Sequence, residues 1–116
     1  MDHWYARTVF FVRDAEISLG FFVDKLGFTL DWNHQEEGRA FVCQVKRDGF
    51  ELILAQDADK AGRGRVFISL DDRQTQALVD ELGRRNMTVR RTQWGMPVIE
   101  VQDVDGNELY FSPPSP

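Results

Sequence analysis

An internal repeat constrains the fold of this chain of 116 residues more than any other feature. The hexapeptide Phe22-Val-Asp-Lys-Leu-Gly27 returns as Leu78-Val-Asp-Glu-Leu-Gly83, with four of six positions identical. The flanking segments return as well: Val9-Phe-Phe-Val-Arg-Asp14 resembles Val66-Phe-Ile-Ser-Leu-Asp71, and Asp48-Gly-Phe-Glu-Leu-Ile-Leu54 resembles Asp105-Gly-Asn-Glu-Leu-Tyr-Phe111. Such self-similarity indicates one supersecondary unit written twice. We therefore expect a single domain, residues 1–116, made of two modules at about 6–56 and 64–112.

Each module is predicted to contain a strand, a helix and three further strands. Residues 6–13 are rich in Val and Phe, and the side chain of Asp14 can accept the free N–H groups of a helix start. Apolar residues then follow at helical spacing up to Gly27, which can take the left-handed conformation that ends a helix, and Gly83 has the same place in the second copy. The other strands are expected at 28–33, 39–46, 50–55, 87–92, 97–103 and 107–112, with turns at Glu37-Gly38 and Asp48-Gly49 and a linker at 57–64.

Charge and cysteine content exclude several classes of protein. The net charge is -5, and the basic residues are scattered apart from two Arg pairs, so we expect no nucleic-acid partner. The single cysteine, Cys43, excludes an intrachain disulfide and a site built from several thiolates. The apolar runs are too short for a membrane span, and the first residues do not resemble a secretory signal. A cytoplasmic location is the default expectation.

Several motifs together resemble the vicinal oxygen chelate superfamily, which includes glyoxalase I, extradiol dioxygenases, and fosfomycin and bleomycin resistance proteins. These motifs are Gly20-Phe-Phe-Val-Asp-Lys-Leu-Gly-Phe28, Phe50-Glu-Leu-Ile-Leu54 and Asp103-Val-Asp-Gly-Asn-Glu-Leu-Tyr-Phe111. The resemblance covers essentially the whole chain. It implies an α+β fold in which two βαβββ modules form a cup-shaped mixed sheet.

The resemblance also suggests where a metal would bind, because metal-dependent members place ligands on the first and last strands of each module. These slots fall on Arg7 and Glu51 in the first module and on Arg65 and Tyr110 in the second. Guanidiniums cannot donate lone pairs, and a divalent metal generally takes three or more good ligands. We therefore expect no metal, no other cofactor and no assigned catalytic residue. Two enzymatic alternatives stay open: a glyoxalase-like lyase or isomerase with an unusual metal site, and acid–base chemistry by Glu51 with Tyr110.

The bleomycin resistance group gives the nearer resemblance, carried by Phe22-Val-Asp-Lys-Leu-Gly-Phe-Thr-Leu-Asp-Trp32 and Gln93-Trp-Gly95. It implies a homodimer that sequesters an aromatic, cationic small molecule such as a drug in a cleft at the subunit interface. Trp32 and Trp94 offer flat faces for stacking, while Phe41 and Met96 could line the same groove. Complementary negative charge could come from acidic residues near Trp32, namely Asp31, Glu36 and Glu37.

A third interpretation concerns the two arginines in matching slots. Arg7 and Arg65 could form a clamp for an endogenous anionic metabolite, or they could pair with Glu51 or other acids inside the cup. The full set of expected ligand-binding residues is Arg7, Trp32, Phe41, Glu51, Arg65, Trp94, Met96 and Tyr110.

Overall fold

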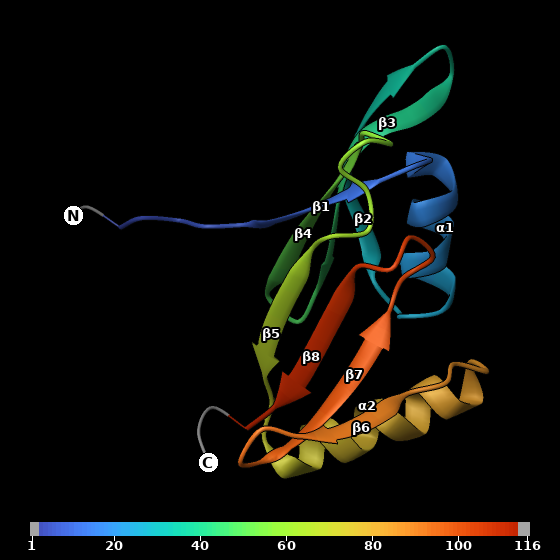
Figure 1. Cartoon of the computed structure of the whole chain (residues 1–116). Helices are drawn as coiled ribbons and strands as arrows, with labels where there is room; N and C mark the ends of the chain where they lie inside the picture. Colours follow the sequence, from blue (N-terminus) through green and yellow to red (C-terminus); the bar gives the residue numbers. More distant parts are fainter. Residues whose placement is uncertain (1–2, 114–116) are drawn as a thin grey trace.

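Two βαβββ modules follow one another along the chain, as the computed structural model of residues 3–113 shows (Figure 1). The α+β class and the modular architecture expected from the repeat are confirmed. That the two modules form one domain stays a prediction. The elements of the first module are β1 (Thr8–Val12), α1 (Ala15–Asp24), β2 (Thr29–Glu36), β3 (Arg39–Arg47) and β4 (Phe50–Gln56). Those of the second are β5 (Arg65–Ser69), α2 (Asp72–Arg84), β6 (Arg90–Gln93), β7 (Pro97–Gln102) and β8 (Glu108–Ser112).

Each module has its own four-stranded mixed sheet. The strand orders are β1-β4-β3-β2 and β5-β8-β7-β6, so the first strand of each module pairs in parallel with the last. The remaining pairs are antiparallel hairpins. In Figure 1 the first sheet lies above the second, with α1 on the right of the first sheet and α2 below the second. Each helix covers one face of its sheet and leaves the other face open.

Two hairpins close through the Xaa-Gly turns that the sequence predicts. Glu37 and Gly38 join β2 to β3 with φ values of 53° and 77°, and Asp48 and Gly49 join β3 to β4 with 49° and 86°. Two consecutive left-handed residues match the twist of the flanking strands, which is why such pairs favour two-residue hairpin loops. These turns fix the register of β2, β3 and β4.

The two helices begin as the sequence predicts but end differently. Asp14 caps α1 by accepting a hydrogen bond from the Ile17 amide, and Asp71 and Gln74 form a reciprocal capping box at the start of α2. Gly27 follows α1 with φ 72°, as expected. Helix α2, however, continues through Gly83 to Arg84, and Asn86 takes the left-handed conformation with φ 61°. The expected end at Gly83 is therefore wrong, because Asn also tolerates this conformation.

The hydrophobic core lies between each helix and its sheet. In the first module Phe10, Phe22 and Leu54 are completely buried, and the Phe22 ring packs edge-on against Phe28 with centroids 5.4 Å apart. Leu82 and Leu109 are the corresponding fully buried residues between α2 and its sheet. Burying one such side chain contributes about 1.5–3 kcal/mol, so the packing of each helix on its sheet is stabilised by several such contributions.

The first strands of the two modules are offset by one residue from the alignment that the sequence suggests. The repeat aligns Leu52 with Leu109 and Val9 with Val66. In the structure, however, the residue that pairs with Leu52 is Thr8, whereas the residue that pairs with Leu109 is Val66. The apparent match of Phe10 with Phe67 therefore breaks down: Phe10 is fully buried and Phe67 is 38% exposed. A shift of one residue moves a side chain to the opposite face of a sheet, which explains the difference.

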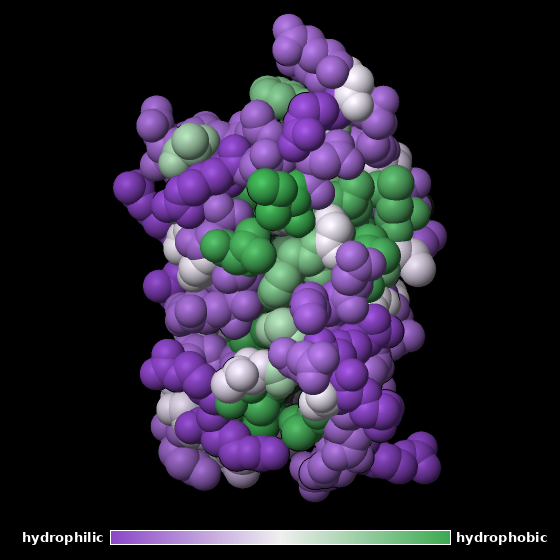
Figure 2. Space-filling model, turned by 90° about the vertical axis from the view of Figure 1, so that its right-hand side faces the viewer, coloured by the Kyte–Doolittle hydropathy of each residue, from purple (hydrophilic) through white to green (hydrophobic). Residues whose placement is uncertain are grey.

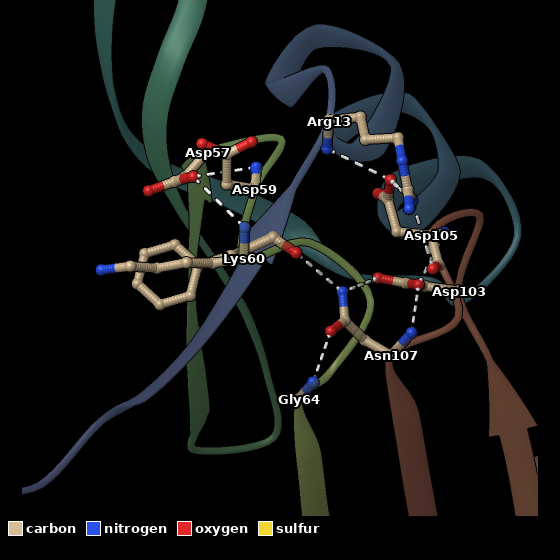
Figure 3. Close-up of polar contacts among 9 residues, drawn as sticks. Arg13, Asp57, Asp59, Lys60, Gly64, Asp103, Asp105 and Asn107 are labelled. Carbon is tan, nitrogen blue, oxygen red and sulfur yellow. Dashed lines mark hydrogen bonds and ion pairs between the residues drawn. The ribbon is translucent and has the colours of Figure 1, made fainter.

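A buried polar joint connects the modules (Figure 3). The Asn107 side chain donates to the carbonyl of Phe11 at 3.0 Å and to the carboxylate of Asp103 at 2.8 Å, and it accepts from the Gly64 amide at 2.7 Å. Beside it, Arg13 donates to Asp105 at 2.9 Å. The joint therefore ties the end of β1 and the linker to the turn between β7 and β8.

Some apolar surface stays uncovered. Ile17 on the outer side of α1 is 59% exposed. Figure 2 views the side of the molecule on which α1 lies and shows hydrophobic residues gathered along the middle of that face. The chain before β1 runs straight out of the molecule in Figure 1, with Trp4 99% exposed and Tyr5 62% exposed. No helix among residues 3–113 is long and apolar enough to cross a membrane.

Candidate functional site

Six of the eight expected ligand-binding residues lie on the two sheet faces that the helices leave open; Phe41 and Met96 are the exceptions. Side chains alternate along a strand, so the neighbours of core residues point to the opposite face. We call the open face of the first sheet the first open face; it carries Arg7, Asp31, Trp32, Gln44 and Glu51. The open face of the second sheet, the second open face, carries Arg65, Phe67, Trp94, Glu100, Glu108 and Tyr110.

Gln44 organises the first open face. Its carbonyl oxygen accepts a hydrogen bond from Arg7 at 3.0 Å, and its amide nitrogen donates to Asp31 at 2.7 Å and Glu51 at 3.2 Å. Asp31 also contacts Lys46 at 3.2 Å. The Gln44 hydrogen bond and the Lys46 ammonium lower the pKa of Asp31. The face is therefore a connected network of opposite charges, and Trp32 stands beside it, 39% exposed.

Ion pairs between neighbouring strands neutralise the second open face. The Arg65 guanidinium lies 2.6 Å from Glu108, and that of Arg90 lies 3.2 Å from Glu100. The two carboxylates are largely covered, with side chains 13% and 12% exposed. Arg65 thus already has an anionic partner, and an anion clamp would require it to leave Glu108.

Three aromatic rings form a wall on the second open face. Phe67 and Trp94 are stacked with centroids 5.9 Å apart, and Trp94 lies 4.7 Å from Tyr110. Phe67 and Trp94 remain 38% and 49% exposed. Flat, exposed rings suit a planar ligand with positive charge, because such a ligand can stack on a ring and the ring face also attracts a cation.

Tyr110 is poorly suited to act as a base. Its hydroxyl donates to Glu108 at 2.7 Å, and this hydrogen bond raises the pKa of Tyr110 to about 12, so the phenol stays protonated at neutral pH. The same bond lowers the pKa of Glu108. Tyr110 is partnered by Glu108, whereas Glu51 is partnered by Gln44 in the other module.

The structure revises one slot assignment. Arg65 lies opposite Glu108 in the β5–β8 register. In the first module Thr8 lies opposite Leu52, so Arg7, one residue earlier, falls at the position of Glu51. The counterpart of Glu51 is therefore Glu108, and Tyr110 lies two positions further along the same face. Of the other expected residues, Phe41 falls at a register irregularity of β3 and is half-buried. Met96 lies in the turn after Trp94 and accepts a hydrogen bond from its amide at 3.0 Å.

The donor set of the open faces does not fit a divalent metal. Each pair of slots contains one guanidinium and one carboxylate, Arg7 with Glu51 and Arg65 with Glu108, and a guanidinium has no lone pair to give. Among the residues that the structure describes, no three His, Cys, Asp or Glu side chains converge.

Sequence reasoning missed four residues of the open faces: Phe67, Glu100, Glu108 and Gln44. Glu108 could have been found, since the repeat itself aligns it with Glu51. Gln44 also left a signal, because it is the one polar residue in the stretch Val42-Cys-Gln-Val45 of a central strand. Glu100 and Phe67 left none that local pattern alone would single out.

Comparison with known proteins places this architecture in a family. No curated protein matches the chain. The fold is shared with the bleomycin-binding protein of bleomycin-producing Streptomyces verticillus, complexed with copper(II)-bleomycin (TM-score 0.77, 22% identity, covering 97% of this chain and 98% of that one). It is also shared with an antibiotic binding protein from a Streptomyces species (0.68, 22%, 97% and 99%) and with a lactoylglutathione lyase from Agrobacterium tumefaciens (0.73, 15%, 95% and 92%). The family model described as "Glyoxalase superfamily protein" matches residues 4–114, and the chain therefore belongs to the glyoxalase superfamily.

Proposed function

We propose that this protein is a metal-independent small-molecule binding protein that sequesters an aromatic, cationic ligand, such as a bleomycin-like drug, on its open sheet faces. The observation that carries the proposal is the aromatic wall of Phe67, Trp94 and Tyr110, whose ring faces can stack on a planar ligand and attract a cation. The fold relatives include proteins that bind antibiotics, which supports a ligand of this class. A cytoplasmic location is part of the same proposal.

The proposed assembly is a homodimer in which the binding cleft lies between subunits. Each chain leaves aromatic groups of its open faces, Trp32 and Trp94, in solvent. The segment before β1 also runs away from the body of the chain (Figure 1), and its Trp4 and Tyr5 are exposed, so a second copy could cover them. An indole that touches water on all sides is unfavourable, so covering these groups would favour association.

The experiment is a calorimetric titration of purified, metal-free protein with copper-free bleomycin, with tryptophan fluorescence read in parallel. We expect saturation near one ligand per subunit, with quenching of tryptophan fluorescence. The variant Trp94→Ala should bind at least about tenfold more weakly, a loss of about 1.4 kcal/mol that corresponds to one stacked ring. The control Ile17→Ala removes an exposed apolar side chain from α1 and should bind normally.

Two results would count against the proposal. Absence of heat and quenching would exclude bleomycin and direct attention to anionic metabolites near Arg7 and Arg65. Binding that depends on added zinc, nickel or manganese would favour a glyoxalase-like enzyme. Sedimentation of the free protein tests the dimer separately, and a monomer at micromolar concentration would contradict it.

A further inference from the structure

A cavity lined by both modules lies on the helix side, away from both open faces. We call it the seam pocket because both modules line it. Its volume is about 320 Å³. Leu26, Phe28 and Phe50 come from the first module, and Leu70, Leu78 and Phe111 come from the second. This volume and the mostly apolar lining match the general character of sites for small molecules.

The charged groups at the rim of the seam pocket neutralise one another. Arg47 binds Glu81 through two contacts of 2.6 and 3.0 Å, and Arg85 binds the same carboxylate at 3.0 Å. Arg47 also donates to the carbonyl of Leu26 at 2.7 Å, so its guanidinium is held in place. We call these three side chains the clasp. Asp48, also at the rim, lies 3.7 Å from the Arg47 guanidinium, so two carboxylates balance two guanidiniums and the rim has little attraction for an ionic ligand.

The clasp borders the seam pocket where α2 meets the first module. It holds the C-terminal half of α2 against the first module, so this helix bridges two modules while it also covers its own sheet. Gly27 allows the close approach: a Cβ there would lie 2.7 Å from Glu81 Oε2 and 2.8 Å from Arg47 Nη1. The space left between α2, β5 and the β3–β4 hairpin is the seam pocket.

We propose that the seam pocket is a second binding site, for a neutral, compact, apolar molecule such as a substituted aromatic ring or a short alkyl chain. The aromatic side chains Phe28, Phe50 and Phe111 provide the contact surface, and the neutral rim selects against ions. Because the walls come from both modules, an occupant stabilises their arrangement and raises the melting temperature. The site is independent of the one proposed on the open faces.

The test uses the neutral, apolar fluorophore N-phenyl-1-naphthylamine. We expect saturable fluorescence enhancement at one site per chain and a higher melting temperature. Ala77→Trp places an indole in the pocket lining and should weaken binding at least tenfold. The control Gln76→Trp adds the same indole to a neighbouring, exposed position of α2 outside the lining and should bind as the natural protein does.

A third variant and a direct measurement separate this site from the open faces. Trp94→Ala should leave dye binding unchanged. Dye binding lost in Trp94→Ala but kept in Ala77→Trp would overturn the inference, as would no saturable binding at all. If Ala77→Trp does not fold, amide chemical shifts of the natural protein decide: shifts around Ser69, Leu78 and Glu81 support the site, and shifts confined to the open faces refute it.

Discussion

Asn107 offers the sharpest test of how the two modules are held together. Its fully buried side chain makes three hydrogen bonds, to the Phe11 carbonyl, the Asp103 carboxylate and the Gly64 amide. Asn107→Ala removes all three. The Gly64 N–H then loses its partner, whereas the Phe11 carbonyl still accepts from Gly62 and the Asp103 carboxylate still accepts from two backbone N–H groups. A buried polar group left without a partner costs about 1–3 kcal/mol.

The expected loss of unfolding free energy for Asn107→Ala is about 3–5 kcal/mol, from about 1–3 for the unpaired Gly64 N–H and about 0.5–1.5 for each of the other two lost hydrogen bonds. This is a large fraction of the roughly 5–15 kcal/mol that stabilises an ordinary domain. The melting temperature should fall by about 10–20 °C in a chain of this size. Urea unfolding followed by circular dichroism measures the change, and Asn33→Ala on exposed β2 is the control.

A second substitution at the same position adds a pH signature. Asn107→Asp keeps the acceptor for Gly64 but places a second carboxylate about 2.8 Å from Asp103, where the Asn amide now stands. Two carboxylates so close share one proton, so the folded-state pKa of the pair rises above that of an unfolded Asp. The shared proton stabilises the folded state of this variant at low pH, and this contribution is lost as the pH rises through the raised pKa.

Asn107→Asp should therefore lose clearly less stability at pH 5 than at pH 7, relative to the natural protein at each pH. The loss in Asn107→Ala should change much less between these pH values. A loss below about 1 kcal/mol in Asn107→Ala would show that the joint carries little energy. Equal losses at both pH values in Asn107→Asp would refute the assigned geometry.

Three further predictions follow from individual contacts. Gly27→Ala should destabilise the protein by about 2 kcal/mol, because φ is 72° and the new Cβ would meet the clasp. Gly20→Ala inside α1 meets nothing within 4 Å and should stabilise it slightly. Urea unfolding compares the two variants, and equal effects would contradict the argument. Glu81→Gln should cost about 1–2 kcal/mol at pH 7. The Arg47 hydrogen bond lowers the pKa of Glu81, so its contribution is present above the unfolded pKa and fades as pH falls through the folded one; a gap that stays constant down to pH 3 would count against this. Burial raises the pKa of Cys43 to about 11, so Ellman's reagent should react slowly with the native protein and fully in denaturant, and fast native reaction would place this thiol elsewhere.

The sequence predicts those parts of the fold that depend on local pattern. The repeat, the two Asp caps and the Xaa-Gly turns give the order of helices and strands, because each depends on a few neighbouring residues. That α2 continues to Arg84, with Asn86 as the left-handed residue after it, is harder to predict, because Gly83 fits the same local rule. The one-residue offset of β5 is invisible locally because Val66-Phe67 and Val9-Phe10 look alike.

The candidate site is predictable only in part, because its partnerships join distant strands. That Arg65 meets Glu108 depends on the parallel pairing of β5 with β8, and pairing register is not written in either strand alone. The same holds for Trp94, which meets Phe67 across the module. The sequence therefore predicts which residue types form a binding face, but only the structure shows which residues they contact.

The order of strands gives each sheet two edges of opposite character. β2 carries two irregularities in its pairing and β6 is short and begins with two arginines, so both are poor templates for another strand. β1 and β5 are regular and more apolar, and the N–H of Gly62 and the side chain of Asn107 cover only the Phe11 end of β1. A strand of another chain is therefore expected to pair with the β1 or β5 edge. At high protein concentration, ordered aggregation would begin there, and a lysine at Phe67 on β5 would be the substitution best placed to prevent it.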